Sequence, residues 1–161
     1  AHAGFKPKLV AKYTTRPPRS DDIDSEVLCL ENIPPHCDLI YEQYGARYGL
    51  ELSALFELIA NGQSPIVILN DVRVVEDVRN AFRELARSVF VFRQDPLSEE
   101  YYQKLIESRG RAGHVRFEKA RILYRIYIEN IHLFDHVIIN SGTFDELEAQ
   151  VRQIIEGLNE E

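Results

Sequence analysis

The sequence predicts an α/β fold in which a parallel sheet is covered by helices on both faces. Three short, continuous apolar runs, at residues 65–69, 89–92 and 136–139, are typical of strands that are buried on both sides. Stretches with helical periodicity alternate with these runs, at residues 74–85, 98–108, 116–131 and 143–158. Buried strands that alternate with helices indicate a parallel sheet between two helical layers.

The first third of the chain predicts a smaller β-rich part. Residues 8–15, 26–30 and 38–44 have the composition of short strands, and polar or proline-containing stretches separate them. We therefore expect a small β-rich segment ahead of the parallel sheet.

Capping residues mark the starts of two predicted helices. Ser53 is the expected N-cap of a helix that ends at Asn61-Gly62. Ser98 is the expected N-cap of another, and the acidic Glu99 and Glu100 favour its first turn.

Length and charge limit the classes of function. With 161 residues we expect one domain, residues 1–161, with one core. A formal charge of −7 and a pI near 5.3 argue against nucleic acid or an anionic membrane as the main partner. No membrane helix or signal peptide is evident, so we expect a soluble cytoplasmic protein. Cys29 and Cys37 lack the spacing of a zinc site, and we expect reduced thiols and no metal.

Polar residues follow each predicted strand of the parallel sheet: Asn70-Asp71, residues 93–95 and Asn140-Ser141. Ligands of such sheets bind at the carboxyl ends of strands, so we expect these residues near a common rim. The alternative is that they are ordinary polar loop residues.

The run Tyr13-Thr14-Thr15-Arg16-Pro17-Pro18-Arg19 predicts an oxyanion clamp. Proline fixes φ and favours an extended residue before it, which holds Arg16 and Arg19 on one stiff arm. A guanidinium is a planar donor that suits a phosphate, and the run therefore indicates a phosphorylated ligand. A solvated loop with two surface charges is the alternative.

Four motifs occur in a fixed order along the chain: Thr14-Thr15-Arg16-Pro17-Pro18-Arg19, Gly45-Ala46-Arg47-Tyr48-Gly49, Glu107-Ser108-Arg109-Gly110 and Phe134-Asp135-His136-Val137-Ile138-Ile139-Asn140. Each alone is a weak signal. In this order they resemble the guanylate kinase family over nearly the whole chain. The resemblance implies a P-loop kinase-like fold with a reduced acceptor-binding part at residues 8–50 and a lid at residues 109–116.

The resemblance implies roles for individual residues. The double-arginine arm and the Tyr-Gly motif bind the acceptor's phosphate in that family, which assigns Arg16, Arg19 and Tyr48 to this role. Arginines of the lid neutralise the transferring phosphoryl group, and the candidates are Arg109, Arg111 and Arg116, with Arg121 and Arg125 as further ones. For those last two, a solvated helix face is the preferred interpretation. Asn140 falls where the family's loop approaches the adenine of the donor.

The chain departs from the family at both substrate sites. It has no Gly-rich loop ending in Gly-Lys-Ser/Thr, the loop that holds the phosphates of Mg-ATP. The guanine-reading glutamate falls near Leu39, and Asp38 and Glu42 are candidates to replace it. The Leu69-Asn70-Asp71-Val72-Arg73 run resembles ribose 1,5-bisphosphate phosphokinase, which makes Asp71 and Arg73 acceptor or magnesium-shell candidates. A helix-start aspartate and an exposed arginine are the alternative.

Two classes of function follow from the resemblance. One is a kinase that uses Mg-ATP on a nucleoside monophosphate or a sugar phosphate, with the donor loop encoded upstream of Ala1. The other is an inactive binding module in which Arg16, Arg19 and Tyr48 recognise a phosphopeptide or a partner protein. Sheets of this type normally have their first strand at the centre, so a chain that lacks this strand should fold poorly by itself. We therefore favour the kinase, with the missing strand and donor loop encoded upstream.

Overall fold

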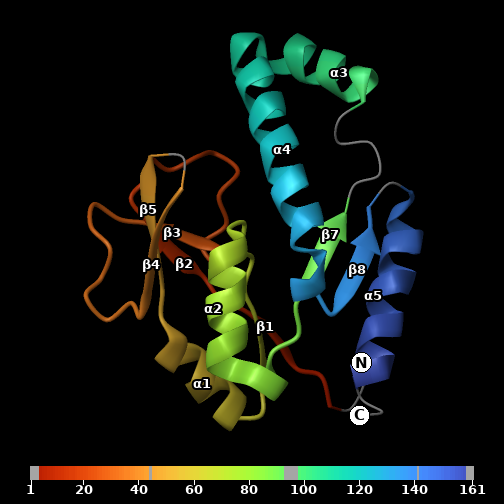
Figure 1. The fold of residues 1–161 in the computed structure, drawn as a ribbon. Helices are drawn as coiled ribbons and strands as arrows, with labels where there is room; N and C mark the ends of the chain where they lie inside the picture. The colour runs from red at the N-terminus through yellow and green to blue at the C-terminus, as the bar shows by residue number, and fades with distance from the viewer. Residues whose placement is uncertain (1–3, 44, 93–97, 141, 159–161) are drawn as a thin grey trace. The chain divides into compact units, whose positions relative to one another are not determined.

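A computed structural model of the chain describes residues 4–43, 45–92, 98–140 and 142–158, and Figure 1 shows its helices and strands. The chain divides into two compact units, Ala1–Val78 and Arg79–Glu161, which we describe one at a time. The predicted acceptor-binding part at residues 8–50 lies in the first unit, and the predicted lid at residues 109–116 lies in the second.

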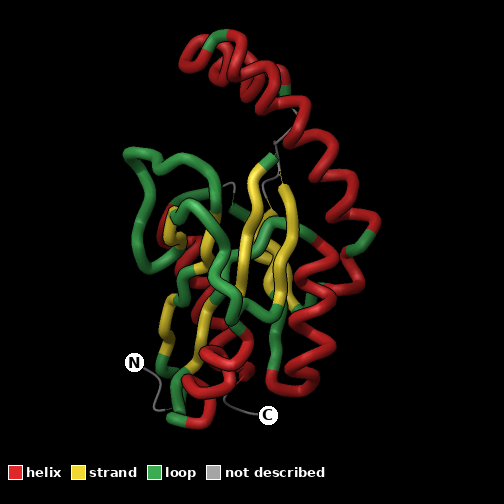
Figure 2. Tube along the Cα trace, turned by 90° about the vertical axis from the view of Figure 1, so that its left-hand side faces the viewer, coloured by secondary structure: helices red, strands yellow, loops and turns green. Residues whose placement is uncertain are grey.

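A four-stranded sheet forms the first part of unit 1. Its order is β3(Val27–Cys29), β2(Lys12–Thr14), β5(Ala46–Leu50) and β4(Leu39–Gln43), drawn in yellow with the loops in green in Figure 2. β2 is parallel to β3 and antiparallel to β5, and β4 is antiparallel to β5. β5 was not predicted from the sequence, because its glycine and small residues obscure its alternation.

The predicted strand at residues 8–15 is two strands in two sheets. β1(Pro7–Leu9) is parallel to β6(Ser64–Ile66), whereas β2 belongs to the four-stranded sheet. The backbone N–H of Val10 still donates to Ile66 O, but that of Lys12 donates to Glu26 O. The chain therefore changes its pairing partner between these two residues, which composition alone does not reveal.

Two helices follow the strands of unit 1 along the chain. They are α1(Leu52–Ala60) and α2(Val72–Phe82), whose last turn belongs to unit 2 and leads into a 3₁₀ turn, Arg83–Leu85. The prediction that Ser53 caps α1 is wrong. The Asp38 carboxylate accepts from the backbone N–H groups of Leu52 at 2.7 Å and Ser53 at 3.4 Å. An acceptor from outside the helix thus satisfies its start, and the Ser53 hydroxyl donates to Glu51 instead.

Unit 2 contains a parallel pair of strands and three helices: β7(Val89–Phe92), α3(Glu99–Arg109), α4(Arg111–Glu129), β8(His136–Ile139) and α5(Phe144–Leu158), with a 3₁₀ turn at Ile131–Leu133. The bounds of β7 and β8 match the prediction. Ser98 caps α3 as predicted, because its hydroxyl accepts from Tyr101 N at 3.1 Å.

Aromatic rings join α4 to β7. Phe90 stacks on Tyr127 with ring centroids 5.2 Å apart, and Phe92 lies 5.6 Å from Tyr124. The outer edge of β8 is held by Gln150 of α5, whose amide both accepts from and donates to the backbone of Ile139. One helix therefore contacts the Phe90 and Phe92 side chains of β7, and another binds the backbone of β8.

The β7–β8 pair is less buried than predicted. Val91 is 54% exposed and Ile139 49% exposed, although both lie in runs expected to be buried on both faces. Among the described residues of this unit, β7 and β8 pair only with each other. The exposure of Val91 and Ile139 shows that the helices of the unit do not fully cover this strand pair.

The junction between α3 and α4 contains two glycines with different roles. Gly110 has a φ of +52°, the left-handed region in which glycine is favoured, and it lets α4 begin directly after α3. A Cβ atom at Gly113 would lie 2.2 Å from the Leu105 carbonyl oxygen, so Gly113 allows the two helices to pack closely.

Candidate functional site

One face of the four-stranded sheet buries an unusual number of polar side chains. The strand register places Lys12, Thr14, Cys29, Gln43 and Tyr48 on this face, which we call the inner face. Thr14 is fully buried, Tyr48 is 7% exposed, and Lys12 and Gln43 are each 9% exposed. Buried polar groups need partners, so their contacts indicate what the face can bind.

Arg16 is held against the inner face by Asp22. Its two terminal nitrogens donate to the two carboxylate oxygens, at 2.8 Å for Nη1 with Oδ2. Asp22 also accepts from the Cys29 thiol at 3.6 Å. These hydrogen bonds raise the pKa of Arg16 and lower the pKa of Asp22. The Arg16 guanidinium therefore has a fixed orientation, and the negative charge of Asp22 compensates its positive charge.

Arg19 is tied to the same carboxylate through its backbone. Its N–H donates to Asp22 Oδ2 at 2.7 Å, and Asp22 N donates back to Arg19 O at 3.2 Å, which closes a turn. The residue is exposed. The structure thus brings Arg16 and Arg19 together at Asp22, with one guanidinium fixed and the other in solvent, and their binding of a phosphate stays a prediction.

Tyr48 and Gly49 are positioned by close packing. The ring of Tyr48 stacks on that of Tyr41 with centroids 5.3 Å apart. A Cβ atom at Gly49 would lie 2.5 Å from Ile33 Cγ2 and 2.8 Å from Cys37 Sγ, so any larger residue would push the strand away from this loop. The Tyr-Gly pair therefore places the tyrosine ring on the inner face.

Lys12 was not predicted as a site residue from the sequence. Its ammonium donates to Ile68 O at 2.6 Å and lies 5.9 Å from the centroid of the Tyr48 ring. Burial lowers its pKa, although the charge of Glu26 opposes this shift. The alternation of Lys12, Thr14 and Arg16, which places all three on one side of an extended chain, is the signal that would have found it.

Two amide groups complete the inner face. Gln43 Nε2 donates to Asn70 O at 2.6 Å, on the segment that follows β6. The buried Gln43 Oε1 and Asn70 Oδ1 have no hydrogen-bond partner within the described residues. They are acceptors that remain available to a ligand that carries N–H or O–H groups.

Four other predicted residues of unit 1 lie in different surroundings. Asp38 caps α1, and Glu42 is exposed on β4 opposite Arg47. Asp71 accepts from the Arg73 backbone at 2.9 Å and from its guanidinium at 3.0 Å. Burial raises the pKa of Asp71, but the hydrogen bonds from Arg73 outweigh it and the pKa is lowered. Asp71 and Arg73 thus match the alternative of a helix-start aspartate and an exposed arginine.

The candidates of unit 2 lie on separate elements. Arg109 ends α3 and Arg116 lies in α4, but their side chains are outside the described residues. Arg111 is the exposed first residue of α4. Asn140 follows β8, and its N–H donates to Phe92 O at 2.6 Å. The ends of β7 and β8 therefore lie side by side. Residues 93–95 and Ser141 lie outside the described residues, and the common rim, the lid and the adenine role stay predictions.

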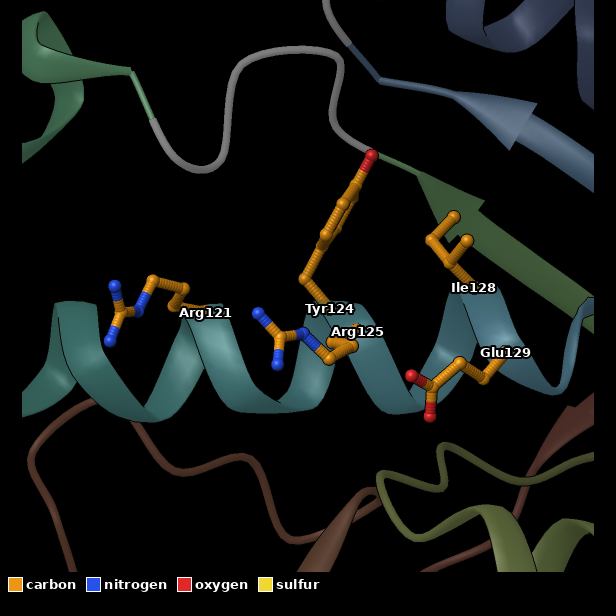
Figure 3. A pocket seen from close by; sticks show the side chains of 5 residues that line it. All are labelled: Arg121, Tyr124, Arg125, Ile128 and Glu129. Atoms are coloured by element: carbon orange, nitrogen blue, oxygen red, sulfur yellow. The ribbon is translucent and has the colours of Figure 1, made fainter.

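A shallow hollow lies along α4 and is lined by Arg121, Tyr124, Arg125, Ile128 and Glu129 (Figure 3). The Tyr124 side chain points away from the helix toward β7, whereas the two arginines lie along the helix surface. Arg121 pairs with Glu118 at 2.9 Å and is exposed. This arrangement agrees with the solvated helix face that we preferred for these arginines.

The contacts of the described residues assign none of them to Mg-ATP. The carboxylate of Asp71, a predicted magnesium-shell candidate, is already occupied by Arg73. Across residues 4–43, 45–92, 98–140 and 142–158, no group of three or more His, Cys, Asp or Glu side chains could hold a metal ion. We therefore assign none of these residues to the nucleotide, and its binding stays a prediction.

The fold is similar to that of a known enzyme. The crystal structure of guanylate kinase from Anaplasma phagocytophilum matches with a TM-score of 0.60 and 20% sequence identity, over 97% of this chain and 75% of that chain. No family model and no curated protein matches the sequence. The structural similarity shows that this chain has a guanylate-kinase-like α/β fold, in agreement with the predicted fold class. Within the described residues, no helix combines the length and apolar composition that a membrane span requires.

Proposed function

We propose that the inner face of the four-stranded sheet binds a phosphorylated small molecule, with the phosphate held by Arg16, Arg19 and Tyr48. The observation that carries the proposal is the fixed guanidinium of Arg16. Asp22 accepts from both terminal nitrogens, and Nη1 also donates to Pro17 O at 3.0 Å, so the Nε–H and the second N–H of Nη2 remain as donors for a phosphate. A donor whose orientation is already fixed loses little conformational entropy when a phosphate binds.

We further propose that the whole protein transfers a phosphate from Mg-ATP to this small molecule, a nucleoside monophosphate or a sugar phosphate. The similarity to a guanylate kinase structure supports this proposal at the level of the fold. Phosphoryl transfer depends chiefly on positioning and on charge stabilisation, and the inner face supplies positioning for the acceptor.

Calorimetric titration of the full chain with GMP and with ribose 5-phosphate tests the binding proposal. Arg16→Ala should weaken binding by roughly 1.5–3 kcal/mol, the contribution of a charge-assisted hydrogen bond, and Arg19→Ala should weaken it less because its side chain is exposed. Arg152→Ala is the matched control. It removes an exposed arginine of α5 that pairs with Glu148, and it should leave affinity unchanged.

Equal affinity in Arg16→Ala and the unmodified chain would contradict the proposal. Binding of a phosphopeptide with no binding of either small molecule would instead support the module that recognises a protein partner.

A further inference from the structure

We propose that Lys12 is a specificity-determining residue of this site, a second buried cation that selects ligands with an anionic group in addition to the phosphate. The inference rests on the proposed function of the inner face, and it concerns the part of the ligand that Arg16 does not reach.

The two cations of the inner face differ in how their charge is compensated. Arg16 has a full counter-charge in Asp22, which contacts it through both carboxylate oxygens. Within the described residues no carboxylate contacts Lys12, whose ammonium lies against a neutral carbonyl, Ile68 O, and the face of the Tyr48 ring. The charge of Glu26 acts on Lys12 without contacting its ammonium, so the charge of Lys12 is compensated less directly than that of Arg16.

A buried ammonium without a contacting counter-charge is costly, because a carbonyl dipole replaces only part of its hydration. Lys12 is 9% exposed, so water supplies little of the missing solvation. A bound anion would complete the set of partners, since the ammonium has three donors and the Ile68 carbonyl uses one.

Tyr48 lies near both Lys12 and Arg16. Its ring lies under the Lys12 ammonium at 5.9 Å, and its hydroxyl is among the groups that raise the pKa of Arg16, after Asp22 and Cys29. Lys12 and Arg16 are four residues apart, roughly 13 Å along an extended chain, and the long side chain of each can shorten the distance between their charges. One small molecule with two anionic groups can therefore contact both cations.

Two matched pairs of probes test this selectivity in the full chain. Fructose 1,6-bisphosphate is compared with fructose 6-phosphate, and 3-phosphoglycerate with glycerol 3-phosphate, so that the second group is a phosphate in one pair and a carboxylate in the other. We expect the unmodified chain to bind the doubly anionic member of at least one pair about tenfold more tightly, the effect of one charge-assisted contact.

Lys12→Met should remove that preference, so that the two members of each pair bind with affinities within about twofold of each other. Lys12→Gln retains a donor for Ile68 O without the charge, so it repeats the test if the methionine variant unfolds. An unchanged preference, or an equal loss for both members of a pair, would overturn the role of Lys12 while phosphate binding stands. Absence of binding by every probe would overturn the proposed function and this inference together.

Discussion

The buried faces of the two units differ in chemistry, because the face in unit 1 buries polar side chains beside apolar ones such as Val27 and Leu50. The inner face in unit 1 buries Lys12, Thr14 and Gln43, whereas β7 in unit 2 packs phenylalanines against the aromatic residues of α4. Polar groups cost free energy when they are buried without full compensation, and aromatic contacts stabilise without such a cost. The difference supports our proposal that the inner face binds a ligand, whereas the aromatic contacts of β7 stabilise unit 2. Substitutions in the two regions should therefore have separable effects.

The largest effect should come from Phe90→Ala. The ring contacts Tyr127, Phe92 and Phe134, so its removal should destabilise unit 2 by about 3 kcal/mol, the lower end for a phenylalanine because this one is half-buried. Urea denaturation followed by circular dichroism measures the loss. Val91→Ala, on the same strand but 54% exposed, should cost less than about 1 kcal/mol. Equal losses would show that the aromatic contacts do not support the unit.

Gly49→Ala should have the next largest effect, in unit 1. Its new Cβ would overlap Ile33 and Cys37, and we expect a destabilisation of about 2 kcal/mol together with weaker binding of glycerol 3-phosphate, because β5 carries Tyr48. A variant that loses stability but keeps its affinity would separate the packing of Gly49 from the site.

Asp135 provides a pH test in unit 2. Burial raises its pKa, but hydrogen bonds from Arg79 and Ser88 outweigh it and lower the pKa. A carboxylate with a lowered folded pKa contributes stability above its unfolded value of about 3.9, and this contribution is lost as pH falls through the folded value. With solvent screening included, we expect Asp135 to contribute about 1 kcal/mol to the free energy of unfolding at pH 6.

Thermal unfolding between pH 6 and pH 2.5 measures this contribution. Asp135→Asn should be less stable than the unmodified chain at pH 6, and the difference should shrink at the acidic end. A difference that is independent of pH would contradict the assignment.

Gly157→Ala should have the smallest effect and the opposite sign. This glycine lies in α5, and among the described residues no atom outside its own stretch of helix lies within 4 Å of the place that a Cβ would take, so alanine should stabilise the helix by about 0.5 kcal/mol. The variant therefore serves as a matched control for Gly49→Ala, and its thermal midpoint should rise slightly.

The sequence predicted local structure better than pairing between distant strands. β7 and β8 are marked by short apolar runs, and the cap at Ser98 is encoded within three residues. The division of residues 8–15 between two sheets depends on partners at Glu26 and Ile66, which periodicity within the segment cannot indicate.

The sequence identified those residues of the candidate site that lie in a recognisable motif. The double-arginine run and the Tyr-Gly pair led to Arg16, Arg19 and Tyr48. Asp22 was not predicted, because an acidic residue in a polar loop has no distinguishing local pattern and its role emerges only when the turn brings it to Arg16.

A nuclear magnetic resonance titration with glycerol 3-phosphate locates the ligand, because it follows both units in one sample. We expect saturable shift changes of the backbone amides at residues 12–19 and 46–50, with no comparable change at residues 89–92 and 136–139. Shifts confined to the second set, or equal small changes in both, would contradict the assignment of the ligand to the inner face.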